Sequence, residues 1–390
     1  MKGKILLLLF FICSLFSGCE RNRNIIEIEE EVEIQEPIVH RLTLVAAGDN
    51  LFHHTMIRPS PGGFNFTSYY AHIRLLIEYA DIAFINQETL LAGKEFGFSG
   101  FPLFNTPQEA GIALIEAGFN VISHANNHVM DMGERAVFTT MDFWDRHPEV
   151  TVLGIHRSQE MRDKPVVIEK NGIRIGFLAY TFSTNGIPVP RNRPYLVSMI
   201  NTDVMAREIN ALRPLCDFLV VSMHWGDEYR FTPNAQQRQL ADFLAEHNVD
   251  LILGHHPHVL QPMEFLPRAD GGKMLCVFSL GNFISAQIPN YTLLGGLLYL
   301  EVQKKDGCVS IEKAGIIPVV THYEQGSTNF RVYPLFNYSE TLLETHRNKL
   351  RSDLTLEYFR TLAIDVLGDA FIDYNPFLGK YPIECYNGYH

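Results

Sequence analysis

From Arg41 onward the chain alternates apolar segments of strand length with amphipathic segments of helix length. Five strands that bear on function are expected at 42–50, 81–89, 119–128, 217–228 and 249–258. Helices are expected between them at 67–80, 107–117, 134–146, 201–212 and 234–247. Such alternation is typical of sheets that contain parallel strands with helices packed on their faces. It predicts an α/β fold for the main part of the chain.

The same five strands all end in polar side chains. The strand ends carry Gly48-Asp49, Gln87-Glu88, Asn126-Asn127-His128, His224 and His256-Pro257-His258. In α/β folds, ligands bind at the carboxyl ends of the strands. We therefore expect these side chains to meet at one edge of the fold and to form a single site.

The chemistry of this set points to metal. The candidate ligands are Asp49, Glu88, Asn127, His224, His256 and His258. Oxygen and imidazole donors without thiolates suit Zn²⁺, Mn²⁺ or Fe. Six donors exceed one tetrahedral site and would support two ions about 3.5–4 Å apart. His128 would then be free to protonate a leaving group.

Several of these residues also have an ordinary structural interpretation. Asp49 after a glycine is typical of a helix cap or a turn, and Asn126-Asn127 is typical of turn chemistry. His224 is compatible with a buried core histidine. One metal ion, or a polar pocket without metal, is the alternative to a two-metal centre.

The N-terminus, MKGKILLLLFFICSLFSGC, has two lysines, an apolar run and small residues before Cys19. Its apolar core is short for a membrane-spanning helix and typical of a secretory signal. The ending LFSGC resembles a bacterial lipobox, which predicts a lipoprotein signal peptide at 1–19 and a lipid on Cys19. Cleavage by ordinary signal peptidase and an uncleaved anchor are the alternatives. The expected organisation continues with an acidic tether at 20–40, one domain at 41–334 and a C-terminal extension at 335–390.

Charge and cysteine content exclude some classes of function. The formal net charge is −12 and no Lys/Arg-rich run occurs, so we expect no nucleic-acid partner. Beyond the signal, Cys216, Cys276, Cys308 and Cys385 are widely spaced, which argues against a zinc–thiolate site. Cys216 and Cys276 lie in apolar surroundings and are expected to be buried thiols. Disulfide pairing cannot be read from the spacing.

Six segments carry a resemblance to a known family. They are AAGDNLFHH, NQETLL, SHANNHVMDMG, VSMHWGDEY, GHHPHVLQPME and SLGNFI, in this order within residues 43–318. Together they resemble the motifs of CapA-type proteins, which are associated with poly-γ-glutamate capsule production and export. The resemblance implies a four-layer α/β/β/α sandwich of the metallophosphatase (calcineurin-like) type.

The resemblance also implies roles for individual residues. Asp49, Asn127, His224, His256 and His258 match metal ligands of the metallophosphatases, and Glu88 falls at the position of their bridging aspartate. His128 matches their catalytic histidine. We place Asn126, His255 and Asn282 in the substrate pocket.

The first motif departs from the metallophosphatase pattern. Those enzymes have Asp-x-His, whereas this chain has Asp49-Asn50-Leu51, so one imidazole is missing. His53 and His54 are the nearest substitutes, at a different spacing. The string GHHPH also allows His255 to take the place of His256 as the ligand.

The sequence is therefore compatible with two alternative functions. The first is a metal-dependent phosphoesterase or related hydrolase, with one or two Mn, Zn or Fe ions, acting on an anionic polymer or phosphorylated substrate. The second is a non-catalytic component of envelope polymer export that binds polymer, a capsule synthase or export subunits. In both, the protein is exported and lipid-anchored to the cell membrane or outer membrane.

Overall fold

The computed structural model describes residues 38–59 and 61–378. The predicted signal peptide, Cys19, nearly all of the predicted tether and Cys385 lie outside the described residues. The first described strand, β1, begins at Val39, two residues before the predicted start of the domain. No helix among the described residues is long and apolar enough to span a membrane.

The first sheet has eight strands, which are parallel in one half and antiparallel in the other. β1 pairs in parallel with β2, β2 with β3, β3 with β4, and β11 adds to the end of β1. On the other side of β1 the sheet continues through antiparallel β12, β13 and β14. The strands are β1 (Val39–Asn50), β2 (Ile82–Gln87), β3 (Val121–Ser123), β4 (Thr151–Leu153), β11 (Asn282–Ile284), β12 (Leu294–Lys305), β13 (Cys308–Glu324) and β14 (Thr328–Pro334).

The second sheet has six strands in the order β5-β6-β7-β8-β10-β9, and the four central strands are parallel. The strands are β5 (Val167–Lys170), β6 (Ile173–Thr181), β7 (Phe218–His224), β8 (Leu251–His255), β9 (Met263–Pro267) and β10 (Lys273–Val277). Asn171 and Gly172 join β5 to β6 with φ of 52° and 78°. The two-residue turn expected of an Asn-Gly pair is therefore present.

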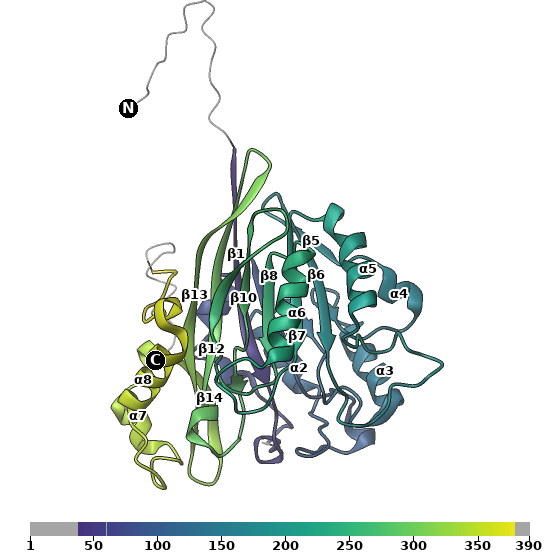
Figure 1. Cartoon of the computed structure of the whole chain (residues 1–390). Coiled ribbons are helices and arrows are strands. Elements are labelled where there is room, and N and C mark those ends of the chain that lie inside the picture. The colour runs from purple at the N-terminus through teal and green to yellow at the C-terminus, as the bar shows by residue number, and fades with distance from the viewer. Residues whose placement is uncertain (1–37, 60, 379–390) are drawn as a thin grey trace, which may run out of the picture. The chain divides into compact units, whose positions relative to one another are not determined.

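The two sheets pack face to face, with helices on the outside (Figure 1). Along β7, Val220 faces the core between the sheets, while Leu219 and Val221 face α5 and α6. This alternation is the period of two expected of a strand buried on both faces. The predicted four-layer α/β/β/α sandwich is confirmed. The helices are α1 (Arg74–Glu78), α2 (Glu109–Glu116), α3 (Gly133–Trp144), α4 (Gln159–Asp163), α5 (Thr202–Leu212), α6 (Ala235–Glu246), α7 (Glu340–Thr345) and α8 (Leu356–Leu367).

Most expected elements are present, and the differences have local causes. β9 and β14 have no clear strand pattern in the sequence, because each is a partly exposed edge strand that ends in proline and lacks a continuous apolar run. The expected helix at 67–80 consists of a 3₁₀ turn at Thr67–Tyr70 followed by the short α1. The predicted extension at 335–390 contributes α7 and α8, whose buried residues Leu343, Phe359 and Ala363 belong to the main core. It is part of the packed structure as far as residue 378.

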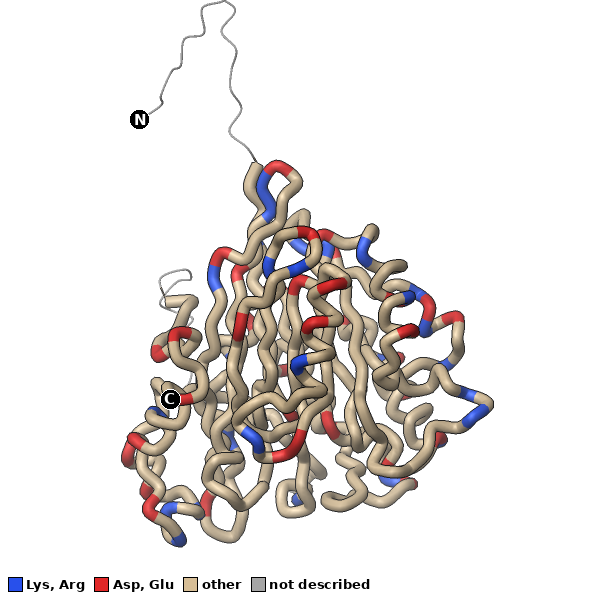
Figure 2. Tube along the Cα trace, viewed as in Figure 1, with Lys and Arg blue, Asp and Glu red and all other residues tan. Residues whose placement is uncertain are grey.

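Cys216 and Cys276 are buried free thiols, as expected, and Cys308 is an exposed free thiol. Charged residues lie mainly along the periphery and the loops, whereas the central strands are nearly free of Lys, Arg, Asp and Glu (Figure 2). The buried acids near the carboxyl ends of the strands are the exception, and they belong to the site described next.

Candidate metal centre

The carboxyl ends of the parallel strands of both sheets converge at one end of the sandwich, which is the lower end in Figure 1. Within the first sheet, Asp49 is the register partner of Asn86 at the end of β2. Within the second sheet, His224 at the end of β7 is the partner of His255 at the end of β8. Since β1 also contacts β8 across the sandwich, residues from both sheets reach one place.

Two glycines allow this approach. A Cβ atom on Gly48 would lie 2.0 Å from the carbonyl oxygen of Gly281, and one on Gly254 would lie 2.0 Å from that of Phe278. Both carbonyls belong to the segment that links β10 to β11, and Asp49 donates its backbone N–H to Gly281 at 2.8 Å. The glycines of the GD and GHH motifs therefore give the linking segment room to pass against both strand ends.

Asp49 organises the loop that follows β8. Its Oδ2 accepts a hydrogen bond from the backbone N–H of His256 at 3.2 Å and lies 3.0 Å from Nδ1 of His258. Its Oδ1 accepts from the side-chain amide of Asn86 at 2.8 Å. With Nδ1 of His258 donating to Asp49, Nε2 of the same ring is left as a free electron-pair donor.

The backbone of this loop is strained. His256 has φ of 95° and His258 has φ of 58°, in the left-handed region that costs a non-glycine residue about 1–2 kcal/mol. Strain of this kind is concentrated at functional sites, where the surrounding structure holds it in place. Here the bonds to Asp49 hold it, and they direct both imidazoles toward the carboxylates.

Glu88 is the most unusual residue of the site. It is completely buried, and neither carboxylate oxygen has a hydrogen-bond partner among the described residues. Its Oε1 lies 3.6 Å from Nε2 of His224 and 3.8 Å from Nε2 of His258. A buried carboxylate without hydrogen bonds is costly unless a cation compensates it.

Glu88 is shared by two groups of side chains that could each hold a metal ion. In one, it meets His224 and His256, and in the other it meets Asp49 and His258. The potential ligand atoms of each group lie within 4.8 Å of one another. Asn127 joins the first group, because its Oδ1 lies 2.9 Å from Nε2 of His224. The donors thus divide into two positions that share one carboxylate.

Burial and mutual charge shift the acidities of these residues. Burial, then the charges of Asp49, Glu228 and Asp131, raise the pKa of Glu88 well above its usual value. Burial also acts to raise the pKa of Asp49, but its interactions with His255 and His258 outweigh burial and lower that pKa well below the usual range. Three carboxylates therefore act on one buried acid, and a cation would relieve their repulsion.

Two imidazoles of the site, those of His224 and His256, are kept neutral. Burial, followed by the charges of neighbouring histidines, lowers the pKa of His224 well below its usual value and that of His256 to about 3. Neutral imidazole is the form that binds metal. Nδ1 of His256 has no hydrogen-bond partner among the described residues, which leaves it available to an ion.

His128 lies beside this group and is held by an acid. Its Nδ1 is 2.8 Å from Oδ2 of Asp131, which also accepts the backbone N–H of Phe104 at 2.7 Å. The ring of Phe104 contacts the imidazole edge to face at 4.6 Å. A histidine oriented by a buried carboxylate at one nitrogen can exchange a proton at the other.

The three residues predicted to lie in the substrate pocket, Asn126, Asn282 and His255, have different surroundings. Asn126 is a buried turn residue that donates to the carbonyl of Gln87 and accepts from the N–H of His128. Asn282 is the register partner of Asp49 in the β1–β11 pair, and its Oδ1 is buried without a hydrogen-bond partner. His255 stacks on Phe84 and belongs to none of the groups that could hold metal, whereas His256 belongs to two.

At the position of the missing imidazole, Leu51 is buried. His54 is exposed. Burial lowers the pKa of His53 to about 4, and its ring packs against Phe104, so it borders the site without joining a ligand group.

Sequence reasoning missed several residues of the site. Asn86 and Asp131 hold Asp49 and His128, and both lie inside motifs that were quoted for other residues. Glu228 groups with His256 and His258. The signal for Glu228 was its place just after the β7 strand, in the same stretch as His224.

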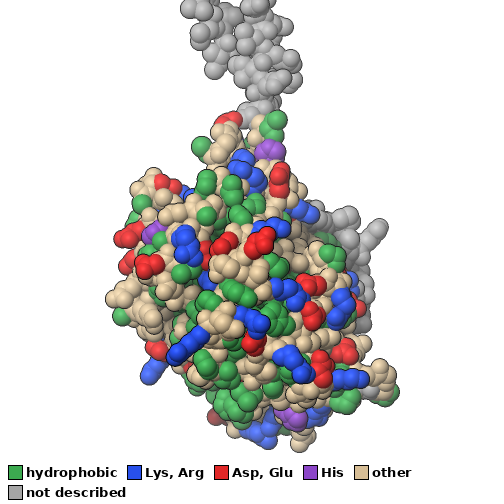
Figure 3. Space-filling model, turned by 90° about the vertical axis from the view of Figure 1, so that its right-hand side faces the viewer, with side chains coloured by type: hydrophobic (Ala, Val, Ile, Leu, Met, Phe, Trp, Pro, Cys, Tyr) green, Lys and Arg blue, Asp and Glu red, His purple; other side chains and the backbone are tan. Residues whose placement is uncertain are grey.

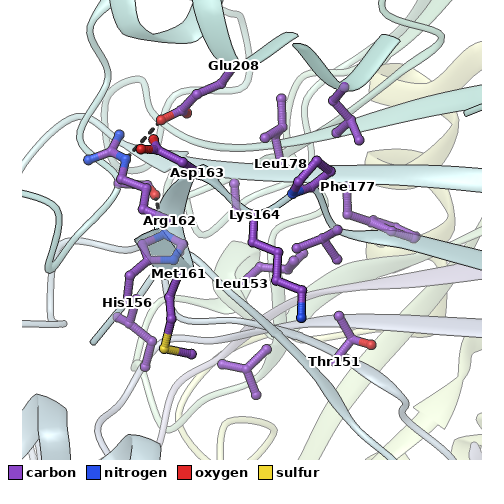
Figure 4. A pocket seen from close by; sticks show the side chains of 18 of the residues that line it. Thr151, Leu153, His156, Met161, Arg162, Asp163, Lys164, Phe177, Leu178 and Glu208 are labelled. Carbon is purple, nitrogen blue, oxygen red and sulfur yellow. Dashed lines mark hydrogen bonds and ion pairs between the residues drawn. The ribbon is translucent and has the colours of Figure 1, made fainter. Parts of the chain in front are cut away.

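A large cavity lies elsewhere in the fold. It has a volume of about 880 Å³ and is lined by residues of β4, α4, β5, β6 and α5, and none of the candidate metal ligands lines it. Figure 4 shows its polar wall, where Arg162 donates to Glu208 at 2.9 Å beside His156 and Lys164. Figure 3, which views the molecule from the side of α3, α4 and α5, shows basic, acidic and apolar side chains interspersed. Because this cavity contains no group of metal-binding side chains, it is separate in chemistry from the centre described above.

Residues 43–287, more than half of the chain, match the family described as bacterial capsule synthesis protein PGA_cap. The chain belongs to this family. The PGA biosynthesis protein CapA of Bacillus subtilis (strain 168) is 33% identical over 184 residues, or 47% of each chain. The capsule biosynthesis protein CapA of Bacillus anthracis is 32% identical over 187 residues, which are 46% of this chain and 43% of that protein. The matched part thus spans about half the length of these relatives.

Solved structures give more distant similarities. The calcineurin-like phosphoesterase YfkN of Bacillus subtilis is 13% identical with a TM-score of 0.42, covering 83% of this chain and all of that one. The NAD nucleotidase of Haemophilus influenzae is 10% identical with a TM-score of 0.48, covering 86% of this chain and 65% of that one. At such identities the similarity concerns the arrangement of the chain and not its activity.

Proposed function

We propose that the chain is a metal-dependent hydrolase of the phosphoesterase type that acts in capsule biosynthesis. The observation that carries the proposal is Glu88, a fully buried carboxylate without hydrogen bonds that two groups of potential ligands share. Removing such a charge from water is costly unless a cation binds it. The proposed substrate is a phosphorylated compound or an anionic polymer, which fits the capsule setting of the family.

The predicted ligands would form two metal positions. Asp49, Glu88 and His258 would hold one divalent ion, and Glu88 with Asn127, His224 and His256 would hold the other. Bound at these positions, two ions would supply an activated water and neutralise charge on a phosphoryl oxygen. Mn²⁺, Zn²⁺ and Fe all suit this set of oxygen and imidazole donors.

His128 would act as the general acid. Asp131 fixes its ring through Nδ1, so that Nε2 can hold the proton that the leaving oxygen needs. Asn185 lies next to the same ring, with its amide nitrogen 3.3 Å from Nδ1 of His128, and its Oδ1 accepts from the amide of Asn127 at 3.2 Å. These contacts link the proposed proton donor to the proposed metal ligands.

The first test is the metal content of the full-length protein, purified without chelator or affinity metal and measured by elemental analysis. We expect about two ions per chain, and their loss in the His256→Ala/His258→Ala variant. His54→Ala is the matched control, because His54 is exposed and belongs to no ligand group. A folded wild-type protein that binds no divalent metal would contradict the proposal.

A metal-free outcome would favour the second candidate function, a polymer- or partner-binding component of capsule export. The observation in its favour is Leu51, a buried aliphatic side chain at the position where the metallophosphatase pattern has an imidazole. The hydrolase is preferred because burying the Glu88 carboxylate is costly unless a cation binds it.

We also propose that the protein works outside the cytoplasmic membrane and is held there by a lipid on Cys19. The support is the sequence alone: a short apolar signal that ends in LFSGC, followed by an acidic tether. Cys19→Ser is expected to move the protein from the membrane fraction to the soluble fraction, because lipid burial is the main source of membrane affinity. Retention of this variant in membranes, measured by fractionation, would contradict lipid anchoring.

A further inference from the structure

One acidic residue near the proposed metal centre has no counterpart in the expected ligand set. Glu228 lies in the loop after β7, and its carboxylate is close enough to His256 and His258 for the three to hold an ion. The potential ligand atoms of these residues lie within 4.8 Å of one another. Unlike Glu88, Glu228 is exposed, so it reaches the centre from the solvent side.

The loop that carries Glu228 is fixed against the histidine loop at both ends. Trp225 donates its backbone N–H to the carbonyl of His255 at 3.1 Å, and Tyr229 donates to that of Pro257 at 2.8 Å. Gly226 and Tyr229 are in the left-handed region, with φ of 87° and 62°. The loop is therefore a defined turn that holds position 228 beside the strained histidines.

The other contacts of the loop distinguish Glu228 from its neighbour. Asp227 belongs to no group of potential ligands, and its Oδ2 accepts from the side-chain amide of Asn234 at 2.9 Å, next to the start of α6. Burial, then the charge of Glu228, raise the pKa of the Tyr229 hydroxyl, and the Tyr229 ring lies 6.1 Å from that of His258. The charge of Glu228 also acts on Glu88.

The two proposed metal positions are unequal without this residue. Glu88, Asn127, His224 and His256 give one position four protein donors, enough for a tetrahedral site. The other has only Asp49, Glu88 and His258, because Leu51 occupies the place of the fourth. Glu228 groups with His258 of this second position and with His256 of the first.

We infer that Glu228 is the ligand that completes the metal position of Asp49, Glu88 and His258, in place of the imidazole absent at Leu51. The inference rests on the proposed function, because it assumes that the centre binds metal. A carboxylate supplied from a solvent-exposed loop makes this position the more accessible of the two.

The experiment is a titration of the chelator-treated, full-length protein with Mn²⁺, followed by calorimetry and by elemental analysis after gel filtration. Wild type is expected to bind two ions. Glu228→Gln is expected to keep one and to bind the second at least about 10-fold more weakly, because loss even of a group that only orients a ligand costs that much at metal sites. Glu228→Asp keeps the charge and should fall between them.

Asp227→Asn is the matched control, because it removes the same charge from the adjacent position of the same loop. Two ions bound by Glu228→Gln with wild-type affinity would overturn the inference and leave the metal centre standing. An equal weakening by Asp227→Asn would also overturn it, because the effect would then be one of charge alone. A wild-type protein that binds no Mn²⁺ would instead overturn the proposed function.

Discussion

Glu88→Gln is expected to abolish binding at both metal positions and, at the same time, to make the metal-free protein more stable. Metal is lost because Glu88 is the donor that the two ligand groups share. Stability rises because glutamine has the shape of glutamate without the charge that burial and the neighbouring carboxylates oppose. The expected gain in the free energy of unfolding at neutral pH comes from loss of the charge alone, since the glutamine amide remains a buried polar group. Elemental analysis and urea unfolding in chelator measure the two effects.

Glu88→Asp is the control for this prediction. It keeps the charge and restores the residue that the metallophosphatase pattern has at this position, so metal binding should largely survive. A Glu88→Gln protein that retains two ions would show that the bridging position is wrong. If the Glu88→Gln protein is less stable than wild type, the Glu88 carboxylate must be stabilised by an interaction other than hydrogen bonding.

The second large effect concerns turnover. His128→Gln is expected to lower kcat for a generic phosphodiester by about 10²–10⁴-fold, the range for loss of a general acid. Metal content should stay at the wild-type value, because His128 belongs to none of the ligand groups. Asp131→Asn, which weakens the 2.8 Å contact that orients the ring, should give a smaller loss of kcat with little change in KM.

The matched control is His54→Gln, an exposed histidine outside the ligand groups, which should leave kcat unchanged. If His128→Gln loses metal together with activity, then His128 is a ligand and not the proton donor. If it keeps full activity on a substrate that wild type cleaves, the assignment of the general acid is wrong.

Much of the fold could be predicted because its strands are apolar and its helices amphipathic. β7 and β8 are completely buried, so their sequences form continuous apolar runs that are easy to recognise. β9 and β14 gave no such signal, because they lie at the edges of their sheets and are partly exposed. A local sequence pattern reflects how deeply a strand is buried. These two edge strands are too exposed to show a continuous apolar pattern.

The choice between His255 and His256 as the metal ligand cannot be made from the local sequence pattern. Adjacent residues of a strand point to opposite faces, so His255 and His256 are not expected to join the same ligand group. The sequence contains both histidines and does not determine which of them points toward the other ligands. The packing of β8 between the sheets places His255 on Phe84, with its Nδ1 3.6 Å from Oδ1 of Asp49. The left-handed turn that follows directs His256 toward Glu88 and His224.

The sequence by itself determined which chemical groups this protein places at the ends of its strands, and in what order. Asp49, Glu88, Asn127, His224 and His258 follow buried strands, and residues at the carboxyl ends of parallel strands meet at one edge. Only the tertiary structure decided how those ends combine, because β1 and β8 belong to different sheets and meet through contacts distant in sequence. Two features depend on those contacts: the lone Glu88 shared by both ligand groups, and Glu228 held over the site by a neighbouring loop.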